Sequence, residues 1–393
     1  MTDIKTIPTA YDGREQALIK HKLLESYLEK LFLIIGMGGR REGHIELCYV
    51  DCFAGPWGDE SVATTSIAIS LKVLDSCRKT LARKGVQASI RALYIEKNPQ
   101  AFSRLEAYLA TEIPEGISAK GMIGDFVQLR SAILNWVGDK AFAFFFIDPK
   151  GWKDIRVDIL QCLLKRTRSE FLINFMYNDV NRAMSMVELQ PLMRELLGET
   201  LDLRNCNALQ RERRILLAYR NGLKKCVFVD NPEYPARSVD VRVLDPMKNR
   251  PKYHLVYVTS HSKGILEFMS ISEEIDLIQR QVRTIKKENA RELRTRTSDM
   301  FEERDVLVDS GFTTEPADVD SFWLTYLGVS VRQVGRSEFA RILEDTDWFP
   351  SDLQASLLRL IQAGQVENMD AKGKRQKKPL HYDVGSGERL RKL

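Results

Sequence analysis

Short apolar runs alternate with amphipathic segments along residues 47–178, and this alternation restricts the fold more than any other feature of the chain. Apolar runs of this length are typical of strands buried on both faces, and the segments between them have the spacing of apolar residues found in helices. Such regular alternation predicts an α/β fold with a doubly wound, mostly parallel sheet. The predicted strands are LCYVDCF (47–53), IRALYIE (90–96), SAKGMIGDF (118–126), AFAFFFID (141–148) and EFLINFMYN (170–178).

Two later apolar runs, KKCVFVDN (224–231) and KYHLVYVTSH (252–261), have no clear helix between them. They predict an antiparallel hairpin at one edge, which completes a Rossmann-like sheet of seven strands. This pattern is associated with S-adenosylmethionine (SAM)-dependent methyltransferases. Periodicity alone does not separate it from other Rossmann relatives.

The remaining segments have a different rhythm. Residues 15–35 predict an amphipathic helix, and residues 275–305 predict a charged helix that connects two domains. Beyond them, two amphipathic helices precede a strand, a basic turn and a second strand, QVENMDA, KGKRQKK and PLHYDVG, the pattern of a winged helix. We therefore predict a Rossmann-like domain with its N-terminal helix, a connector, and a small C-terminal α+β module with a basic wing and tail: residues 1–272, 273–324 and 325–393.

Composition narrows the class of protein. An apolar content of 44% and a charged content of 29% are ordinary for a globular protein, and no apolar stretch is long enough to span a membrane. The six cysteines lack CxxC spacing and the five histidines lack the spacing of metal ligands, so we expect reduced thiols, a cytoplasmic location and no metal. Residues 371–393 carry eight Lys or Arg against two Asp or Glu, either a surface for phosphates or a solvated tail.

Acidic residues end the first three predicted strands, where ligands bind in open α/β sheets. The first strand leads into DCFAGPWG, in which glycines allow close backbone approach and the acid suits the cationic end of an amino-acid moiety. This turn is not a GxGxxG dinucleotide motif; a tight turn needing glycine for geometry alone is the alternative. An acid after the second strand can bind ribose hydroxyls, and one after the third can bind an adenine amine, although either can cap a helix instead. The predicted cofactor residues are Asp51, Phe53, Ala54, Gly55, Gly58, Glu96, Asp125 and Phe126.

The fourth strand ends at Asp148, which Pro149 follows. Asp148 is either a helix cap or a functional residue of a binding site. Nucleotide aminomethyltransferases carry a D-P-P-[YF] motif at this place, where the acid binds an exocyclic amine and the aromatic stacks on a flipped base. Here Lys150 and Gly151 replace its last two positions, and the aromatic, Trp152, follows one residue late. We predict that Asp148, Pro149, Lys150 and Trp152 form the reaction centre, although Trp152 can equally be a packing residue and Lys150 a solvated one.

Polar residues are dense after the fifth strand and at the end of the late hairpin. They line the site or serve as helix caps and turn residues. The first group contains Asn174, Tyr177, Asn178, Asp179, Asn181 and Arg182, and the second contains His261 and Lys263.

Several of these blocks, in this order, resemble the three-Cys-motif partner protein family (TcmP): KHKLLESYLEKLF, YVDCFAGPWG, YIEKNP, FFFIDPKGW and YVTSHSKG. The resemblance covers roughly residues 15–270. It implies a Rossmann-like fold similar to class I SAM-dependent methyltransferases, with SAM near Asp51, Gly55, Glu96 and Asp125 and a reaction centre at Asp148. It also implies a partner protein that carries the three cysteines, and it defines no substrate.

Three functions are compatible with the sequence. The first is a SAM-dependent methyltransferase acting on an amino group of a nucleic-acid base or a similar planar amine, with DNA or RNA held by the basic C-terminal module. The second is a methyltransferase of a small molecule, or of a peptide handled with a three-cysteine partner. The third is a non-catalytic adaptor with a SAM-binding fold that binds nucleic acid.

Overall fold

A computed structural model describes residues 6–41, 43–55, 62–295, 314–328, 330–373, 375 and 378–393. In chain order, the helices and strands of the larger part are α1 (Glu15–Gly38), β1 (His44–Asp51), α2 (Ser66–Arg83), β2 (Gln87–Glu96), α3 (Pro99–Glu112), β3 (Ile117–Ile123), α4 (Phe126–Val137), β4 (Phe142–Ile147), α5 (Val157–Leu164), β5 (Ser169–Phe175), α6 (Tyr177–Ala183), α7 (Gln190–Leu197), α8 (Ala208–Cys226), β6 (Arg237–Leu244), β7 (Pro251–Thr259) and α9 (Ser262–Thr295). The C-terminal part contains α10 (Pro316–Leu327), β8 (Arg332–Val334), α11 (Arg336–Asp345), α12 (Pro350–Gln362), β9 (Val366–Asn368) and β10 (Glu388–Lys392).

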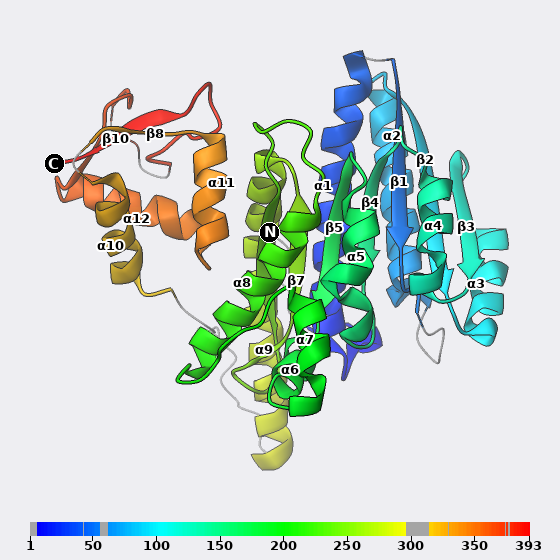
Figure 1. The fold of residues 1–393 in the computed structure, drawn as a ribbon. Coiled ribbons are helices and arrows are strands. Elements are labelled where there is room, and N and C mark those ends of the chain that lie inside the picture. The colour runs from blue at the N-terminus through cyan, green and yellow to red at the C-terminus, as the bar shows by residue number, and fades with distance from the viewer. Residues whose placement is uncertain are drawn as a thin grey trace.

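The seven strands of the larger part form one sheet in the order β3-β2-β1-β4-β5-β7-β6 (Figure 1). Strand β7 runs antiparallel to both β5 and β6, and the other neighbouring pairs are parallel. This is the Rossmann-like arrangement of seven-stranded methyltransferase sheets, so the predicted fold class is confirmed. The order reverses between β1 and β4, which makes the carboxyl ends of these strands the expected place for a ligand.

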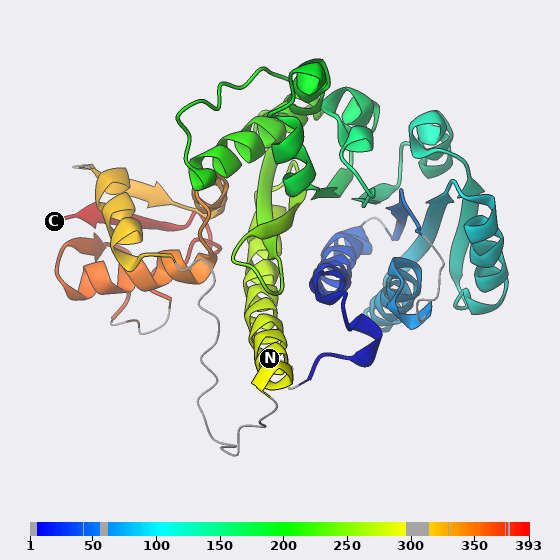
Figure 2. The same cartoon turned by 90° about the horizontal axis from the view of Figure 1, so that it is seen from below.

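Helices cover both faces of the sheet, as Figure 2 shows. Helices α1, α2, α3 and α9 pack on one face, where alternate strand residues such as Leu47, Tyr49 and Phe144 are buried. Helices α4, α5, α7 and α8 pack on the other face against Val50 and Phe145. Burial on both faces explains why strand β4 is apolar at every position rather than at alternate ones.

One predicted strand of this sheet is wrong. Residues 224–231 form the end of α8 and an irregular segment in which Phe228 and Val229 are exposed, and the edge strand is β6, Arg237–Leu244. This strand contains charged residues that partners elsewhere in the chain neutralise. Asp240 contacts His254 on β7, and Arg242 contacts Glu212 on α8. Apolar content therefore did not identify it.

The C-terminal part contains both predicted helices, α11 and α12, and a three-stranded sheet in the order β8-β10-β9. The second predicted strand of the hairpin, PLHYDVG, is wrong, because the last strand is β10. In place of a strand partner, the Gln354 side chain donates to the Leu380 carbonyl and accepts from the Leu380 N–H. The identification of this module as a winged helix stays a prediction.

The two parts of the chain contact each other along α8, α9 and β6. Glu344 on α11 binds Arg237 at 2.7 Å, and Asp347 binds Arg213 at 2.7 Å. The predicted boundaries at 272/273 and 324/325 fall inside α9 and α10, and residues 296–313 of the predicted connector lie outside the described residues. The division into domains stays a prediction. In the described part of the chain, no helix combines the length and hydropathy needed to cross a membrane.

Candidate functional site

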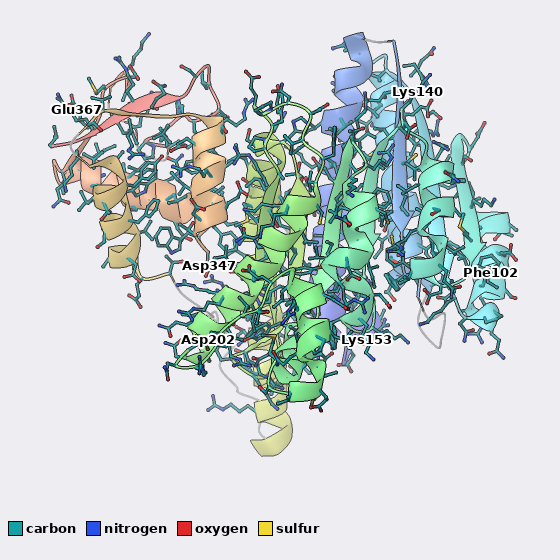
Figure 3. The ribbon with its side chains drawn as sticks, viewed as in Figure 1. Phe102, Lys140, Lys153, Asp202, Asp347 and Glu367 are labelled. Carbon is teal, nitrogen blue, oxygen red and sulfur yellow. The ribbon has the colours of Figure 1, made fainter. Side chains whose placement is uncertain are left out.

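A cavity of about 1390 Å³ opens at the carboxyl ends of the parallel strands. Its walls come from the loops after β1, β2, β3, β4 and β5, from the first half of α1 and from the start of β7. Two labelled residues in Figure 3 mark the two ends of the strands: Lys140 precedes β4, and Lys153 follows it. Lys153 lines the cavity, so nearly all the strand-end residues predicted from the sequence meet at one place.

Asp51 is the last residue of β1, and its carboxylate is fully buried behind the turn that follows this strand. It accepts hydrogen bonds from the Phe53 N–H at 3.1 Å and the Ser66 hydroxyl at 2.6 Å. Burial raises the pKa of Asp51 to about 6, against the lowering effect of these two donors. Asp51 therefore shapes the turn from below and is not one of the residues that line the cavity.

The turn that Asp51 supports reaches the cavity with its next residues. Phe53, Ala54 and Gly55 line the wall, and Gly55 has a φ of +72°, a conformation that favours glycine. Gly58, also predicted to bind the cofactor, lies outside the described residues. The position whose backbone conformation favours glycine therefore lies on the cavity wall.

The acids after β2 and β3 also line the cavity, and of the two only Asp125 caps a helix, because the cap of α3 is Asn98. Glu96 accepts a hydrogen bond from the Asn98 N–H at 2.7 Å, and Asp125 caps α4 by accepting from the Val127 N–H at 2.9 Å. The ring of Phe126 packs against Phe53 with centroids 5.0 Å apart. Each carboxylate keeps accepting capacity for a ligand hydroxyl or amine, because only one oxygen is used.

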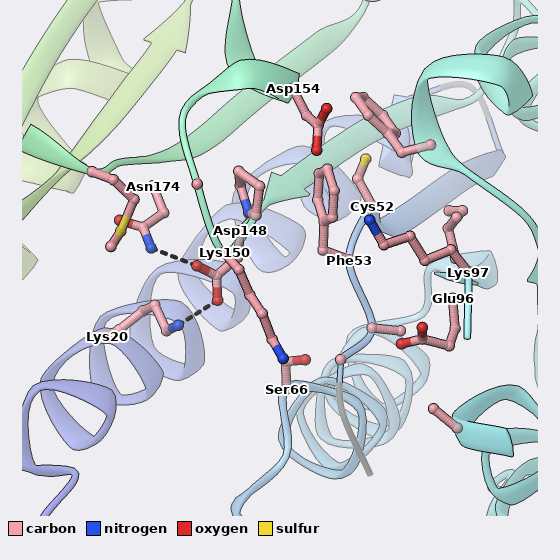
Figure 4. A pocket seen from close by; sticks show the side chains of 18 of the residues that line it. Lys20, Cys52, Phe53, Ser66, Glu96, Lys97, Asp148, Lys150, Asp154 and Asn174 are labelled. Carbon is pink, nitrogen blue, oxygen red and sulfur yellow. Dashed lines mark hydrogen bonds and ion pairs between the residues drawn. The ribbon is translucent and has the colours of Figure 1, made fainter. Parts of the chain in front are cut away.

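Asp148 does not cap a helix. Its Oδ2 contacts the Lys20 ammonium, and its Oδ1 accepts from the Asn174 amide at 2.6 Å (Figure 4). The side chains of Asp148 and Lys20 are only 18% and 14% exposed. This cluster joins three elements, α1, β4 and β5, at the cavity wall.

Asn174 carries a further unsatisfied group. The residue is 4% exposed, and its Oδ1 has no hydrogen-bond partner among the described residues. Because the Nδ2 faces Asp148, the amide orientation follows from the hydrogen bond itself. A buried acceptor without a donor is rare, and here it belongs to a residue of the cavity wall.

Sequence reasoning missed the contribution of α1. Lys20 and His21 line the cavity, and burial lowers the pKa of His21 to about 3, assisted by the neighbouring Lys20 charge. The imidazole is therefore neutral at physiological pH, and its Nδ1 lies 3.1 Å from the Tyr11 hydroxyl. The only sequence signal was a Lys-His pair beside the apolar stripe of the helix, and nothing local connects it to a residue 128 positions away.

The loop after Asp148 places its other predicted residues differently. Pro149 and Lys150 line the cavity, and Lys150 is exposed, with no ion pair to any described residue. Trp152 touches the cavity but is only 8% exposed and packs in the core under α5. The structure thus favours the packing alternative for Trp152 over stacking on a substrate.

Only some of the remaining polar candidates line the cavity. Asn174 and Asp179 line the cavity, whereas Asn178 donates to the Lys252 carbonyl at 3.3 Å. Capping by Asn178 or Asp179 is wrong, because α6 begins after Met176 without a side-chain cap. His261 and Lys263 are absent from the cavity wall. They follow the antiparallel β7, whose end lies beside the amino end of β5, away from the cavity. The start of β7 contributes Lys252 and Tyr253 instead.

The cavity wall carries polar and aromatic groups that can contact an organic ligand. The described residues contain no group of three His, Cys, Asp or Glu side chains arranged for a metal. The cavity wall instead offers a turn at Gly55, two carboxylates and a half-buried phenylalanine.

Comparison with known proteins adds little to this geometry. No family model and no curated protein matches the chain. Among the solved structures that match is a putative O-methyltransferase from Klebsiella pneumoniae, with 9% identity and a TM-score of 0.28; the match covers 65% of this chain and 91% of that chain. The assignment of the fold therefore depends on the strand order itself.

Proposed function

We propose that this protein is a SAM-dependent methyltransferase. The observation that carries the proposal is the meeting, in one cavity, of the turn at Gly55, the acids Glu96 and Asp125, and the polar cluster around Asp148. The strand order puts the first three over β1, β2 and β3 and the last over β4 and β5. In this proposal one half of the site takes a nucleoside cofactor and the other half takes a methyl acceptor.

The cofactor half would hold SAM through this chain's own groups. Glu96 would accept from the ribose hydroxyls, Asp125 from the adenine amine, and Phe53 would contact the adenine ring. Asp51 would favour the cationic amino group from beneath the turn, through its charge rather than by contact. When bound, SAM supplies an activated methyl group, so the chain's task is to hold the acceptor in line and to exclude water.

The acceptor half would hold its ligand at Asp148. The sequence predicts an exocyclic amine of a nucleobase as this acceptor, and that stays a prediction. The resemblance to the TcmP family and the three-cysteine partner are likewise predictions that the comparisons do not test.

The test is calorimetric titration of SAM and S-adenosylhomocysteine into the purified chain. We expect binding by the wild type and its loss in Glu96→Ala, because the carboxylate that faces the ribose is removed. Glu112→Ala is the matched control, since Glu112 is an exposed acid at the far end of α3. Asp51→Ala is informative only if circular dichroism shows a folded protein, because Asp51 is fully buried.

Absence of binding by a well-folded wild type would contradict the proposal and would favour the adaptor function. Equal loss of binding in Glu96→Ala and Glu112→Ala would show that the site has been placed wrongly. Binding of both ligands, lost only with Glu96, supports the cofactor half as described.

A further inference from the structure

The Lys20 ammonium contacts the carboxylate at which the sequence predicts that an amine acceptor binds. Both oxygens of Asp148 already have a donor, one from Lys20 and one from Asn174. The carboxylate is thus partly neutralised and partly satisfied before any substrate enters. A ligand at Asp148 meets a positive charge as well as a negative one.

The sign of the charge that develops on the acceptor separates an amine from a hydroxyl. A neutral amine that receives a methyl group gains positive charge, which a nearby ammonium opposes. A hydroxyl that receives a methyl group loses its proton, and a nearby ammonium stabilises the negative charge on its oxygen. The Lys20–Asp148 pair therefore suits an oxygen acceptor.

The position of Trp152, in the loop after β4, also disfavours a nucleobase amine as the acceptor. Recognition of a flipped base needs an aromatic or apolar face that is open to the base. Trp152, the predicted stacking residue, is 8% exposed and belongs to the core. The acceptor half thus lacks the expected platform for a base at the position that the sequence suggested.

Three lysines around the acceptor half form no ion pair with any residue that the structure describes. Lys150 and Lys153 lie in the loop after β4, and Lys252 lies at the start of β7; all three line the cavity, and none forms an ion pair with a described residue. By contrast, Arg375, Arg389 and Arg391 of the C-terminal module are paired with Glu388, Asp370 and Glu367. Unpaired lysines at a cavity mouth match a phosphate backbone.

We infer that the methyl acceptor is the 2′-hydroxyl of RNA, with Lys20 as the group that stabilises its oxygen. This inference rests on the proposed methyl transfer. In the step, the bond between the methyl carbon and sulfur breaks, and sulfur keeps the electron pair. The bond between the methyl carbon and the ribose oxygen forms, and the hydroxyl proton passes to the Asp148 carboxylate and then to water. Lys150, Lys153 and Lys252 hold the adjacent phosphates.

The experiment uses SAM with a radioactive methyl group and two probes, a random-sequence RNA pool and a DNA pool of the same length. We expect label in RNA and none in DNA, because only RNA has the hydroxyl. After alkaline hydrolysis the label should remain in dinucleotides, since methylation of the 2′-oxygen blocks cleavage of the next phosphodiester. SAM affinity is measured in parallel by calorimetry.

Variants of α1 test the assigned role of Lys20. We expect Lys20→Met to lower kcat by about 10²-fold or more while SAM affinity is unchanged, the loss typical of a group that stabilises an oxyanion. Lys20→Arg keeps the charge and should retain part of the rate, which a purely structural role would not predict. Lys22→Met is the matched control, because Lys22 pairs with Glu25 outside the cavity and should leave kcat unchanged.

Each outcome bears on the inference separately from the proposed function. Label in DNA, or label in the mononucleotides after alkaline hydrolysis of the RNA, would overturn the hydroxyl acceptor and restore the amine. No label in either pool with intact SAM binding would overturn the RNA substrate while the cofactor site stands. No SAM binding would remove the proposed function and this inference with it.

Discussion

The two halves of the cavity are built in different ways. In the cofactor half, Asp51, Glu96 and Asp125 each accept a hydrogen bond from the N–H two residues further along the chain. In the acceptor half, the partners of Asp148 are 128 and 26 residues away. The first half consists of local turns at strand ends, and the second exists only when α1, β4 and β5 are packed together. Substitutions should therefore act independently in the first half and together in the second.

The largest expected effect is that of Asp148→Asn. This change keeps the shape of the side chain but leaves the Lys20 ammonium without its counter-charge. We expect methyl transfer to fall by about 10²-fold or more, equivalent to about 3 kcal/mol in the barrier, with SAM affinity unchanged. Turnover and calorimetry measure the two quantities, and Asp158→Asn on the outer surface of α5 is the control.

The double variant Lys20→Met/Asp148→Asn sharpens the comparison of the two halves. Because the two side chains act as a pair, the combined loss of rate should be far smaller than the product of the single losses. Multiplicative losses would show that the acceptor half is not a coupled unit.

The pH dependence of stability should reveal the buried acid of the cofactor half. Burial raises the pKa of Asp51 to about 6 in the folded protein, whereas an unfolded chain has a value of about 4. The folded state thus binds this proton more tightly, and the stabilisation is present below about pH 4 and is lost as the pH rises through about 6. The shift corresponds to on the order of 2–3 kcal/mol.

Urea unfolding of the wild type and Asp51→Asn across this range measures the effect. We expect the free energy of unfolding of the wild type to fall relative to the variant between about pH 4 and pH 6. A difference that does not change with pH would mean that Asp51 is ionised at no cost and is not buried as described.

The same contrast explains how much the sequence could predict. Acids at strand ends, the Gly55 turn and the Asp125 cap are local patterns, and the structure has them where the sequence indicated. Lys20 was missed because its ion-pair partner, Asp148, follows a strand far along the chain. The edge strand β6 was missed for a similar reason, since His254 and Glu212 neutralise its Asp240 and Arg242. Residues whose role depends on a distant partner give no periodic signal.

The anchoring of α1 should have a smaller effect on stability. The Tyr27 hydroxyl donates to Glu170 at 3.2 Å and also contacts the Tyr257 hydroxyl, so it ties α1 to β5 and β7. Tyr27→Phe removes a donor from a fully buried carboxylate, and we expect a loss of about 1–2 kcal/mol in the free energy of unfolding. Turnover should fall as well, because Lys20 is on the same helix, whereas SAM affinity should not.

Denaturant unfolding checks this value, with Tyr234→Phe at an exposed loop as the control. A Tyr27→Phe protein with full stability and reduced turnover would show that the Tyr27 hydroxyl positions α1 without stabilising the fold. A loss of SAM affinity instead of turnover would contradict the division of the cavity into two halves.

The smallest expected effect is on the local cap next to Glu96. Asn98 caps α3 by accepting from the Gln100 and Ala101 N–H groups, and Asn98→Ala removes this side-chain cap. We expect a loss of about 1 kcal/mol in stability. The backbone N–H of residue 98 still binds Glu96 in the variant, so SAM affinity should change by only a few-fold. A fall as large as that of Glu96→Ala would mean that the cofactor half, too, depends on coupled contacts. If the cofactor half consists of local turns, the loss of the Asn98 cap should leave the Glu96 carboxylate in place.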